Sequence, residues 1–249
     1  MVFLRNFFLF GAFLFLLTAC EERINIKDYY FPREDLELKG MVYEYRSSGD
    51  LPMPTIYWYY YGTWENRHKF LNGIYMEADF IPRQTVKEEF IKTGILLDSV
   101  AISMPDTANK MVSVSGEVLV GNVFPYSVVE DGGIFLYKVK FELPDGTGTT
   151  ATLIKNRQYD TDTIFNFNNT MYDCVKFDVK ELVEYGSEED GYTEPGFSGV
   201  EVYAKSIGLV HYTKETEDGT FMKYTLLKRY PLEEADVFLR EELLKMGIK

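Results

Sequence analysis

Residues 171–179 read Met-Tyr-Asp-Cys-Val-Lys-Phe-Asp-Val, and from Val175 onward apolar and charged side chains alternate one by one. A period of two is typical of a β-strand with one buried face, because successive side chains of a strand point to opposite sides. We expect Val175, Phe177 and Val179 on the buried face and Lys176 and Asp178 on the wetter face. The stretch therefore predicts a half-buried strand of an antiparallel sheet.

Similar runs follow one another along most of the chain. Asp-Gly pairs at 131–132, 145–146 and 218–219 separate several of them, and this dipeptide favours the positive φ of tight hairpins. Short spacing with few helical stretches predicts an antiparallel, mainly β domain over residues 38–230. Residues 84–92 fit a helix and a strand about equally. The predicted strands are 38–46, 55–61, 70–80, 94–103, 111–120, 134–143, 149–159, 163–167, 171–185, 199–204, 207–214 and 221–230.

Two further rows share the alternation and are expected to be buried. One contains Val202 and Ala204, and the other contains Phe135, Tyr137, Val139 and Phe141.

The segment after Pro231 has a helical period instead. Acidic residues fill its first turn, Lys245 lies in its last turn and Gly247 follows it. We expect an amphipathic C-terminal helix within residues 231–249 that packs on the sheet, a partner-binding helix being the alternative. Its predicted apolar stripe consists of Ala235, Phe238, Leu239, Leu243 and Met246.

The N-terminus has the pattern of an export signal. Arg5 precedes an unbroken apolar run from Phe7 to Leu17, which is too short to span a bilayer comfortably. Residues 17–20, Leu-Thr-Ala-Cys, resemble a bacterial lipobox. That resemblance implies that residues 1–19 are a signal peptide, that Cys20 carries the lipid, and that residues 20–37 tether the domain. An ordinary signal peptide is the alternative.

Composition restricts the function further. The 249-residue chain has a formal charge of −13, which argues against a nucleic-acid partner and against docking on anionic headgroups. With Cys20 lipidated, Cys174 has no partner for a disulfide, and we expect it to be a buried thiol rather than a reactive one.

Several segments together resemble exported lipoproteins that are common in Bacteroidetes. The strongest are the strand around Cys174 and the run Val-Tyr-Ala-Lys-Ser-Ile-Gly-Leu-Val-His-Tyr at 202–212, joined by residues 40–46, 57–60 and 221–226. Through this pattern the chain is similar to the LolA and LolB lipoprotein carriers. The resemblance implies a curved antiparallel sheet, or half-barrel, with an apolar concave face and no catalytic residue. Ser206 stands where the pattern usually has glycine. Gly208 predicts a bulge or a close backbone approach.

An aromatic strand supplies the candidate ligand site. Ile56, Trp58 and Tyr60 share one face, and the tyrosines between and after them share the other. One face would be core and the other a platform for sugar rings or lipid. The alternative is that both faces are covered, one by the sheet and one by the C-terminal helix. The candidate residues are Tyr57, Trp58, Tyr59, Tyr61 and Trp64.

Other motifs are weaker. His68 and His211 lack the spacing of a zinc site, so we expect no metal and no cofactor. Three Asp-(Ser/Thr)-apolar tripeptides resemble glycosylation acceptors of Bacteroidetes, and their hydroxyl residues are Ser99, Thr107 and Thr163.

These observations favour a non-enzymatic lipoprotein of the bacterial envelope, anchored by its N-terminal lipid at the outer membrane, on its periplasmic or its surface face. It would bind a lipid or another apolar ligand in a half-barrel. The alternatives are a glycan-binding surface lipoprotein, an accessory subunit that docks on an outer-membrane protein, and a hydrolase with two carboxylates, since such pairs have no fixed spacing.

Overall fold

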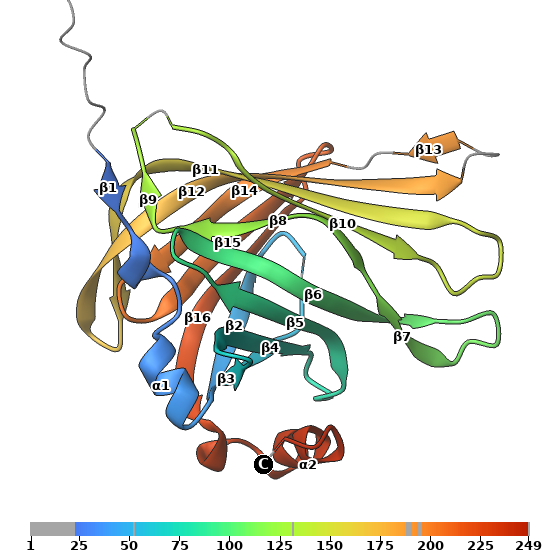
Figure 1. Ribbon diagram of the computed structural model, residues 1–249, viewed down its shortest axis with the longest axis horizontal. Helices are drawn as coiled ribbons and strands as arrows, with labels where there is room; N and C mark the ends of the chain where they lie inside the picture. Colours follow the sequence, from blue (N-terminus) through green and yellow to red (C-terminus); the bar gives the residue numbers. More distant parts are fainter. Residues whose placement is uncertain (1–22, 52, 131, 188–190, 194–195, 249) are drawn as a thin grey trace, which may run out of the picture.

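The computed structural model describes residues 23–51, 53–130, 132–187, 191–193 and 196–248. Strands dominate this part of the chain (Figure 1). The elements are β1 (Ile24–Asn25), η1 (Lys27–Tyr29), α1 (Arg33–Leu38), β2 (Met41–Gly49), β3 (Ile56–Glu65), β4 (His68–Met76), β5 (Pro82–Phe90), β6 (Gly94–Pro105), β7 (Met111–Ser115), β8 (Glu117–Pro125), β9 (Ser127–Val128), β10 (Phe135–Glu142), β11 (Thr150–Phe167), β12 (Thr170–Ser187), β13 (Gly191–Thr193), β14 (Gly196–Ala204), β15 (Gly208–Thr216), β16 (Phe221–Pro231), η2 (Leu232–Glu234) and α2 (Val237–Lys245).

Among the described residues, twelve antiparallel strands form a closed ring. Neighbours in the ring follow each other along the chain, from β2 through β6, β8, β10, β11, β12 and β14 to β16. The ring closes because the first strand, β2, pairs with the last, β16, from Met41 opposite Pro231 to Gly49 opposite Met222. β7 and β13 pair with β6 and β12 outside this ring. The architecture is therefore a closed barrel, and the expectation of a half-barrel is wrong.

Tight turns account for the meander. Asn66-Arg67 and Asn168-Asn169 each have positive φ at both positions, as a two-residue hairpin with the twist of its strands requires. Gly146 and Gly219 also have positive φ, so the two Asp-Gly predictions at these turns are confirmed. The pair at 131–132 includes a residue outside the described ranges.

The strand predictions differ from the structure mainly in extent. Residues 82–90 form a strand, which resolves the ambiguous segment. The runs 149–159 and 163–167 are one long strand, β11, interrupted by a bulge at Asp160, and the run 111–120 is divided between β7 and β8.

The segment before β2 closes one end of the barrel. Ile26 and Leu36 are fully buried, and the Phe31 ring lies 4.2 Å from Tyr60 and 5.4 Å from Tyr43, centroid to centroid. A Cβ on Gly208 would lie 2.6 Å from the Phe31 ring, so this glycine permits the close approach that the sequence predicted. The described part of the tether thus belongs to the core, at the left-hand end of the barrel in Figure 1.

The C-terminal helix covers the outside of the barrel beneath β3 and β4 (Figure 1). Asp236 caps its start by accepting a hydrogen bond from the backbone N–H of Phe238, so Ala235 precedes the helix. Leu239 and Leu243, one turn apart, are fully buried. The predicted stripe is wrong for Phe238 and Met246, which are exposed, because a short helix laid on a sheet buries a narrow face.

The predicted rows of core residues are largely confirmed. Val175, Phe177 and Val179 are buried, as are Val202 and Ala204. In the β10 row, by contrast, only Val139 and Phe141 are buried, while Phe135 and Tyr137 are half-buried.

Phe177 and Lys176 give a test of this register. Phe177 is fully buried among Phe124, Tyr159 and Tyr203, so Phe177→Ala should lower the free energy of unfolding by about 3–5 kcal/mol. Lys176 lies on the opposite face in an ion pair with Asp160, so Lys176→Ala should change it by at most about 0.5 kcal/mol. Denaturant midpoints measure both, and equal small changes would contradict the register.

Candidate functional site

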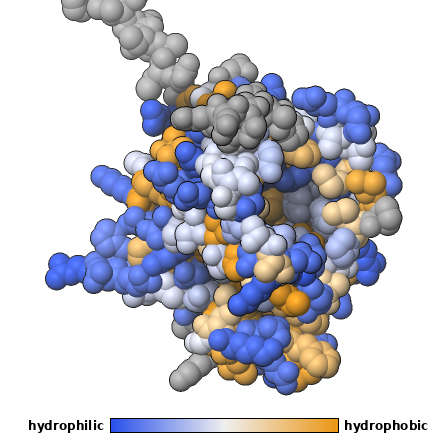
Figure 2. Space-filling model, turned by 90° about the vertical axis from the view of Figure 1, so that its right-hand side faces the viewer, coloured by the Kyte–Doolittle hydropathy of each residue, from blue (hydrophilic) through white to orange (hydrophobic). Residues whose placement is uncertain are grey.

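The barrel encloses a cavity of about 600 Å³ that is open at one end. Figure 2 looks onto the right-hand end of the barrel in Figure 1 and shows the hollow there. An eight-stranded barrel is just narrow enough for its own side chains to fill it, whereas twelve strands leave more space. The N-terminal segment fills that space at one end of the barrel, and the cavity is the unfilled space at the other end.

Apolar and aromatic side chains form one part of the wall. Trp58 lies between Tyr60, stacked on it at 5.3 Å, and Tyr75 at 5.4 Å. Aliphatic side chains of neighbouring strands continue this surface, and they are Val86, Leu97, Val100, Ile102, Met104, Val139 and Leu153.

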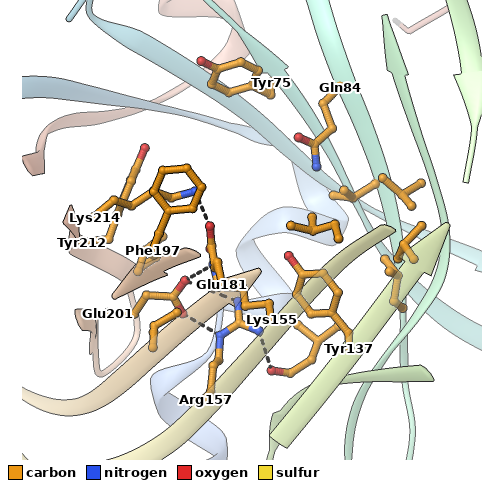
Figure 3. A pocket seen from close by; sticks show the side chains of 18 of the residues that line it. Tyr75, Gln84, Tyr137, Lys155, Arg157, Glu181, Phe197, Glu201, Tyr212 and Lys214 are labelled. Atoms are coloured by element: carbon orange, nitrogen blue, oxygen red, sulfur yellow. Dashed lines mark hydrogen bonds and ion pairs between the residues drawn. The ribbon is translucent and has the colours of Figure 1, made fainter. Parts of the chain in front are cut away.

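The other part of the wall carries charge (Figure 3). Lys155 and Arg157 come from β11, Glu181 from β12, Glu201 from β14 and Lys214 from β15. Along β11 they continue the inward row of Leu153, and along β12 Glu181 continues the inward row of Val179. Alternation thus points these charges into the barrel.

Ion pairs join the five groups in an alternating series. Arg157 Nε lies 2.6 Å from Glu201 Oε2, and Lys155 Nζ lies 2.5 Å from Glu201 Oε1 and 2.6 Å from Glu181 Oε1. Lys214 Nζ lies 2.5 Å from Glu181 Oε2 and ends the series. The first four groups are nearly buried, and Lys214 is about one-third exposed. Pairing is what makes burial of these charges tolerable.

Glu201 has no spare acceptor. Besides the two contacts above, its carboxylate accepts from Arg157 Nη2 at 3.4 Å and from the Tyr203 hydroxyl at 2.8 Å, which uses about four lone-pair sites. Burial opposes ionisation, but the cations outweigh it and hold the pKa of Glu201 well below its usual range. They likewise lower the pKa of Glu181 to about 2.

Glu88 behaves in the opposite way. Its side chain is buried in the cavity wall, where it accepts a 2.5 Å hydrogen bond from the Tyr30 hydroxyl. Burial raises its pKa to about 7, although Tyr30 and Arg157 pull it down.

A pair of carboxylates at work in hydrolysis needs one proton donor and one free base. Glu181 and Glu201 both contact Lys155 Nζ, so they lie close together, but their lowered pKa leaves neither with a proton to donate. The raised pKa of Glu88 suits a proton donor, yet the lone pairs of its neighbour Glu201 are occupied, so Glu201 is not a free base. The arrangement therefore favours binding over acid–base catalysis.

The aromatic candidates from the sequence separate into three places. Trp58 lines the cavity. Tyr57, Tyr59 and Tyr61 lie on the outer face, against the cluster that contains Leu239 and Leu243 of α2. The outer face of this strand thus packs against α2, as the alternative predicts for one face, whereas the inner face borders the cavity.

Trp64 lies elsewhere, near the end of β3. It is 57% exposed, but Lys69 Nζ lies 3.9 Å from the centre of its ring.

The remaining candidates are scattered. Cys20 lies outside the described residues. Cys174 is buried and its pKa is raised to about 11 by burial and by Asp173, as expected for an unreactive thiol. Ser99 and Thr107 are exposed and Thr163 is half-buried, so glycosylation of these residues stays a prediction.

The two histidines have different partners. His68 pairs with Glu89, and His211 Nδ1 lies 3.0 Å from the Thr225 hydroxyl. Within the described ranges, no three His, Cys, Asp or Glu side chains gather as they would around a metal ion.

The charged wall was not anticipated from the sequence, although a signal for it exists. Lys155 and Arg157 occupy the same alternate positions as Leu153 and Tyr159, and Glu181 those of Val179 and Val183. Charges at core positions of several strands indicate a polar interior site.

Fold and cavity together define a closed antiparallel β-barrel with an internal cavity that is open at one end. No protein-family model matches the sequence, and no curated protein matches it either.

Two solved structures are similar to it. A protein from Parabacteroides distasonis, provisionally described as a lipoprotein, is 11% identical with a TM-score of 0.48, over 80% of this chain and 95% of that one. A protein from Bacteroides fragilis, provisionally described as exported and as having a YmcC-like fold, is 12% identical with a TM-score of 0.49, over 80% and 98%. We therefore infer function from the sequence and the cavity alone.

In the part of the chain that the structure describes, none of the helices has the length and apolar character needed to cross a membrane.

Glu88 makes the stability depend on pH. A carboxyl with a raised pKa in the folded state stabilises the fold fully below its ordinary value of 4.5, and this contribution is lost as the pH rises through about 7. The loss is about 3 kcal/mol. Glu88→Gln should remove this pH dependence. The unfolding free energy of the variant minus that of the wild type should therefore increase from pH 4.5 to 7. His211 has a lowered pKa, so its contribution to stability rises with pH. This contribution is the same in both proteins and cancels in the difference.

Glu89→Gln is the matched control, because Glu89 follows Glu88 in the chain but pairs with the exposed His68. Chemical unfolding at several pH values measures all three proteins. A parallel pH dependence of Glu88→Gln and wild type would contradict the raised pKa.

Proposed function

We propose that this chain is a lipid-anchored protein of the bacterial envelope that holds a lipid or another apolar molecule in its barrel without chemically changing it. The cavity is the observation that carries the proposal. Its volume of about 600 Å³ falls within the range of small-molecule sites, which are concave and mostly apolar with a few polar groups.

The layered interior supports binding rather than a purely structural role. Below the cavity the barrel is solid, with Phe124, Phe177 and Tyr203 in mutual ring contact. In the wall of the cavity itself, Trp58 and Tyr75 are only half-buried, although such large rings contribute most when they are fully covered. An apolar ligand would cover them.

The lipobox supports a lipid-anchored location at the cell envelope. We further propose that the anchor lies in the outer membrane. Glycan binding is less favoured, because the exposed face of Trp64 is shared with Lys69 and the tyrosine row is covered. Docking on an outer-membrane protein is a separate role, which affinity capture from the native membrane would test.

Ile102→Trp should test the cavity. Ile102 lines it from β6, so the larger ring would occupy ligand space and lower the amount of co-purified ligand several-fold in native mass spectrometry. Ala101→Trp is the control, because Ala101 is the next residue and points out of the barrel. Equal ligand content in the two variants, or none in the wild type after gentle extraction, would contradict binding in the cavity.

Cys20→Ser should test the anchor. The serine cannot take the thioether-linked lipid, so the variant should leave the membrane fraction or accumulate as an uncleaved precursor. Fractionation with intact-mass measurement reports both outcomes. A variant that is still processed and still membrane-bound would contradict the lipobox prediction.

A further inference from the structure

The charged wall of the cavity does not balance. Three cations, Lys155, Arg157 and Lys214, face two carboxylates, Glu181 and Glu201, in the series described above. The series begins and ends with a cation, so these five groups carry one net positive charge. The nearby carboxyl of Glu88 is hydrogen-bonded to Tyr30, and its raised pKa limits how much negative charge it adds at neutral pH.

Lys214 is the member of the series with unused capacity. Its ammonium has three donors, and its one ion pair is with Glu181 Oε2. It is also the most exposed of the five side chains, at 36%, and its Nζ lies 5.9 Å from the ring of Phe197 in the cavity wall. Arg157 and Glu201, at the other end, are nearly buried and mutually satisfied. Positive charge is therefore available where the wall reaches solvent.

The opposite wall has one ionisable group, Glu88, which is buried and already accepts a hydrogen bond from the Tyr30 hydroxyl. Tyr75 and Gln84 are its polar residues in Figure 3, and Trp58, Val86 and Ile102 make it apolar. A molecule that satisfies both walls has an apolar chain and one anionic group.

We propose that the cavity selects amphiphiles with a single anionic headgroup, a long-chain carboxylate being the simplest. The headgroup accepts hydrogen bonds from Lys214 Nζ and neutralises the net charge of the ion-pair series. The chain lies against Trp58 and the aliphatic side chains around it. This inference rests on the proposed function, because it names the class of ligand for the same cavity. A charge-assisted hydrogen bond of this kind contributes about ten- to hundredfold in affinity.

Three probes with the same hexadecyl chain separate the headgroup from the chain. The full mature protein is titrated with palmitate, palmityl alcohol and cetyltrimethylammonium, below their aggregation limits and at a pH where the carboxyl is ionised. We expect palmitate to bind at least about tenfold more tightly than the alcohol, and the cation to bind most weakly.

Lys214→Met should abolish the preference. It keeps most of the side-chain volume, and Glu181 remains paired with Lys155, so the fold should persist. Palmitate affinity should fall about tenfold to the level of the alcohol, with the affinity for the alcohol unchanged. Lys176→Met is the control, because Lys176 has similar exposure, at 32%, but pairs with Asp160 on the outer face, and it should leave all three affinities unchanged.

The possible results separate the two proposals. Equal affinity for palmitate and the alcohol in the wild type, or a preference for the cation, would overturn the headgroup inference and leave the apolar cavity standing. Equal losses for palmitate and the alcohol in Lys214→Met would also overturn it, because they would indicate a distorted site. Failure of the wild type to bind any of the three would contradict the proposed function itself.

Discussion

The pairing of β2 with β16 is the constraint on which the rest of the structure depends. It joins the two ends of a meander, so every described strand of the ring has a partner on both sides, whereas the short strands β7 and β13 lie outside the ring. It also fixes the number of strands in the ring, and twelve strands enclose more space than wall side chains can fill. The N-terminal segment fills one part of that space and the charged side chains fill another. The cavity is the part that stays open.

The charged wall shows how such an interior can hold ionic groups. Arg157 or Glu201 alone would be an uncompensated charge in a nearly dry environment, at a cost of several kcal/mol. Arg157 on β11 and Glu201 on β14 face each other across β12 and satisfy each other, and Tyr203 and the Val123 carbonyl take up further hydrogen-bonding capacity. Apolar residues of similar shape would serve stability as well, so the series is better explained by what it presents to the cavity.

Local pattern predicted most of the strands and the row of Phe177, because alternation and turn residues act over a few positions. Closure could not be predicted in the same way, since nothing near Val42 in the sequence identifies Tyr230 as its partner. The same limit applies to the site. Trp58 could be assigned to a face but not to a cavity, and Tyr59 needed α2, from the far end of the chain, before its burial was evident. Lys155 and Glu181 stand at core positions of their strands, and this pattern could have predicted a polar site inside the barrel.

The closing pair also sets the order in which the barrel can be completed. β2 is among the first strands to emerge during synthesis or export, and its partner β16 is among the last. Until then β2 carries an unpaired edge with Tyr43 and Tyr45 uncovered, which is a hazard for aggregation. The hairpins between them form locally and fast, whereas joining the ends incurs the entropy of closing the whole chain. Slow final closure is the folding behaviour that this topology favours.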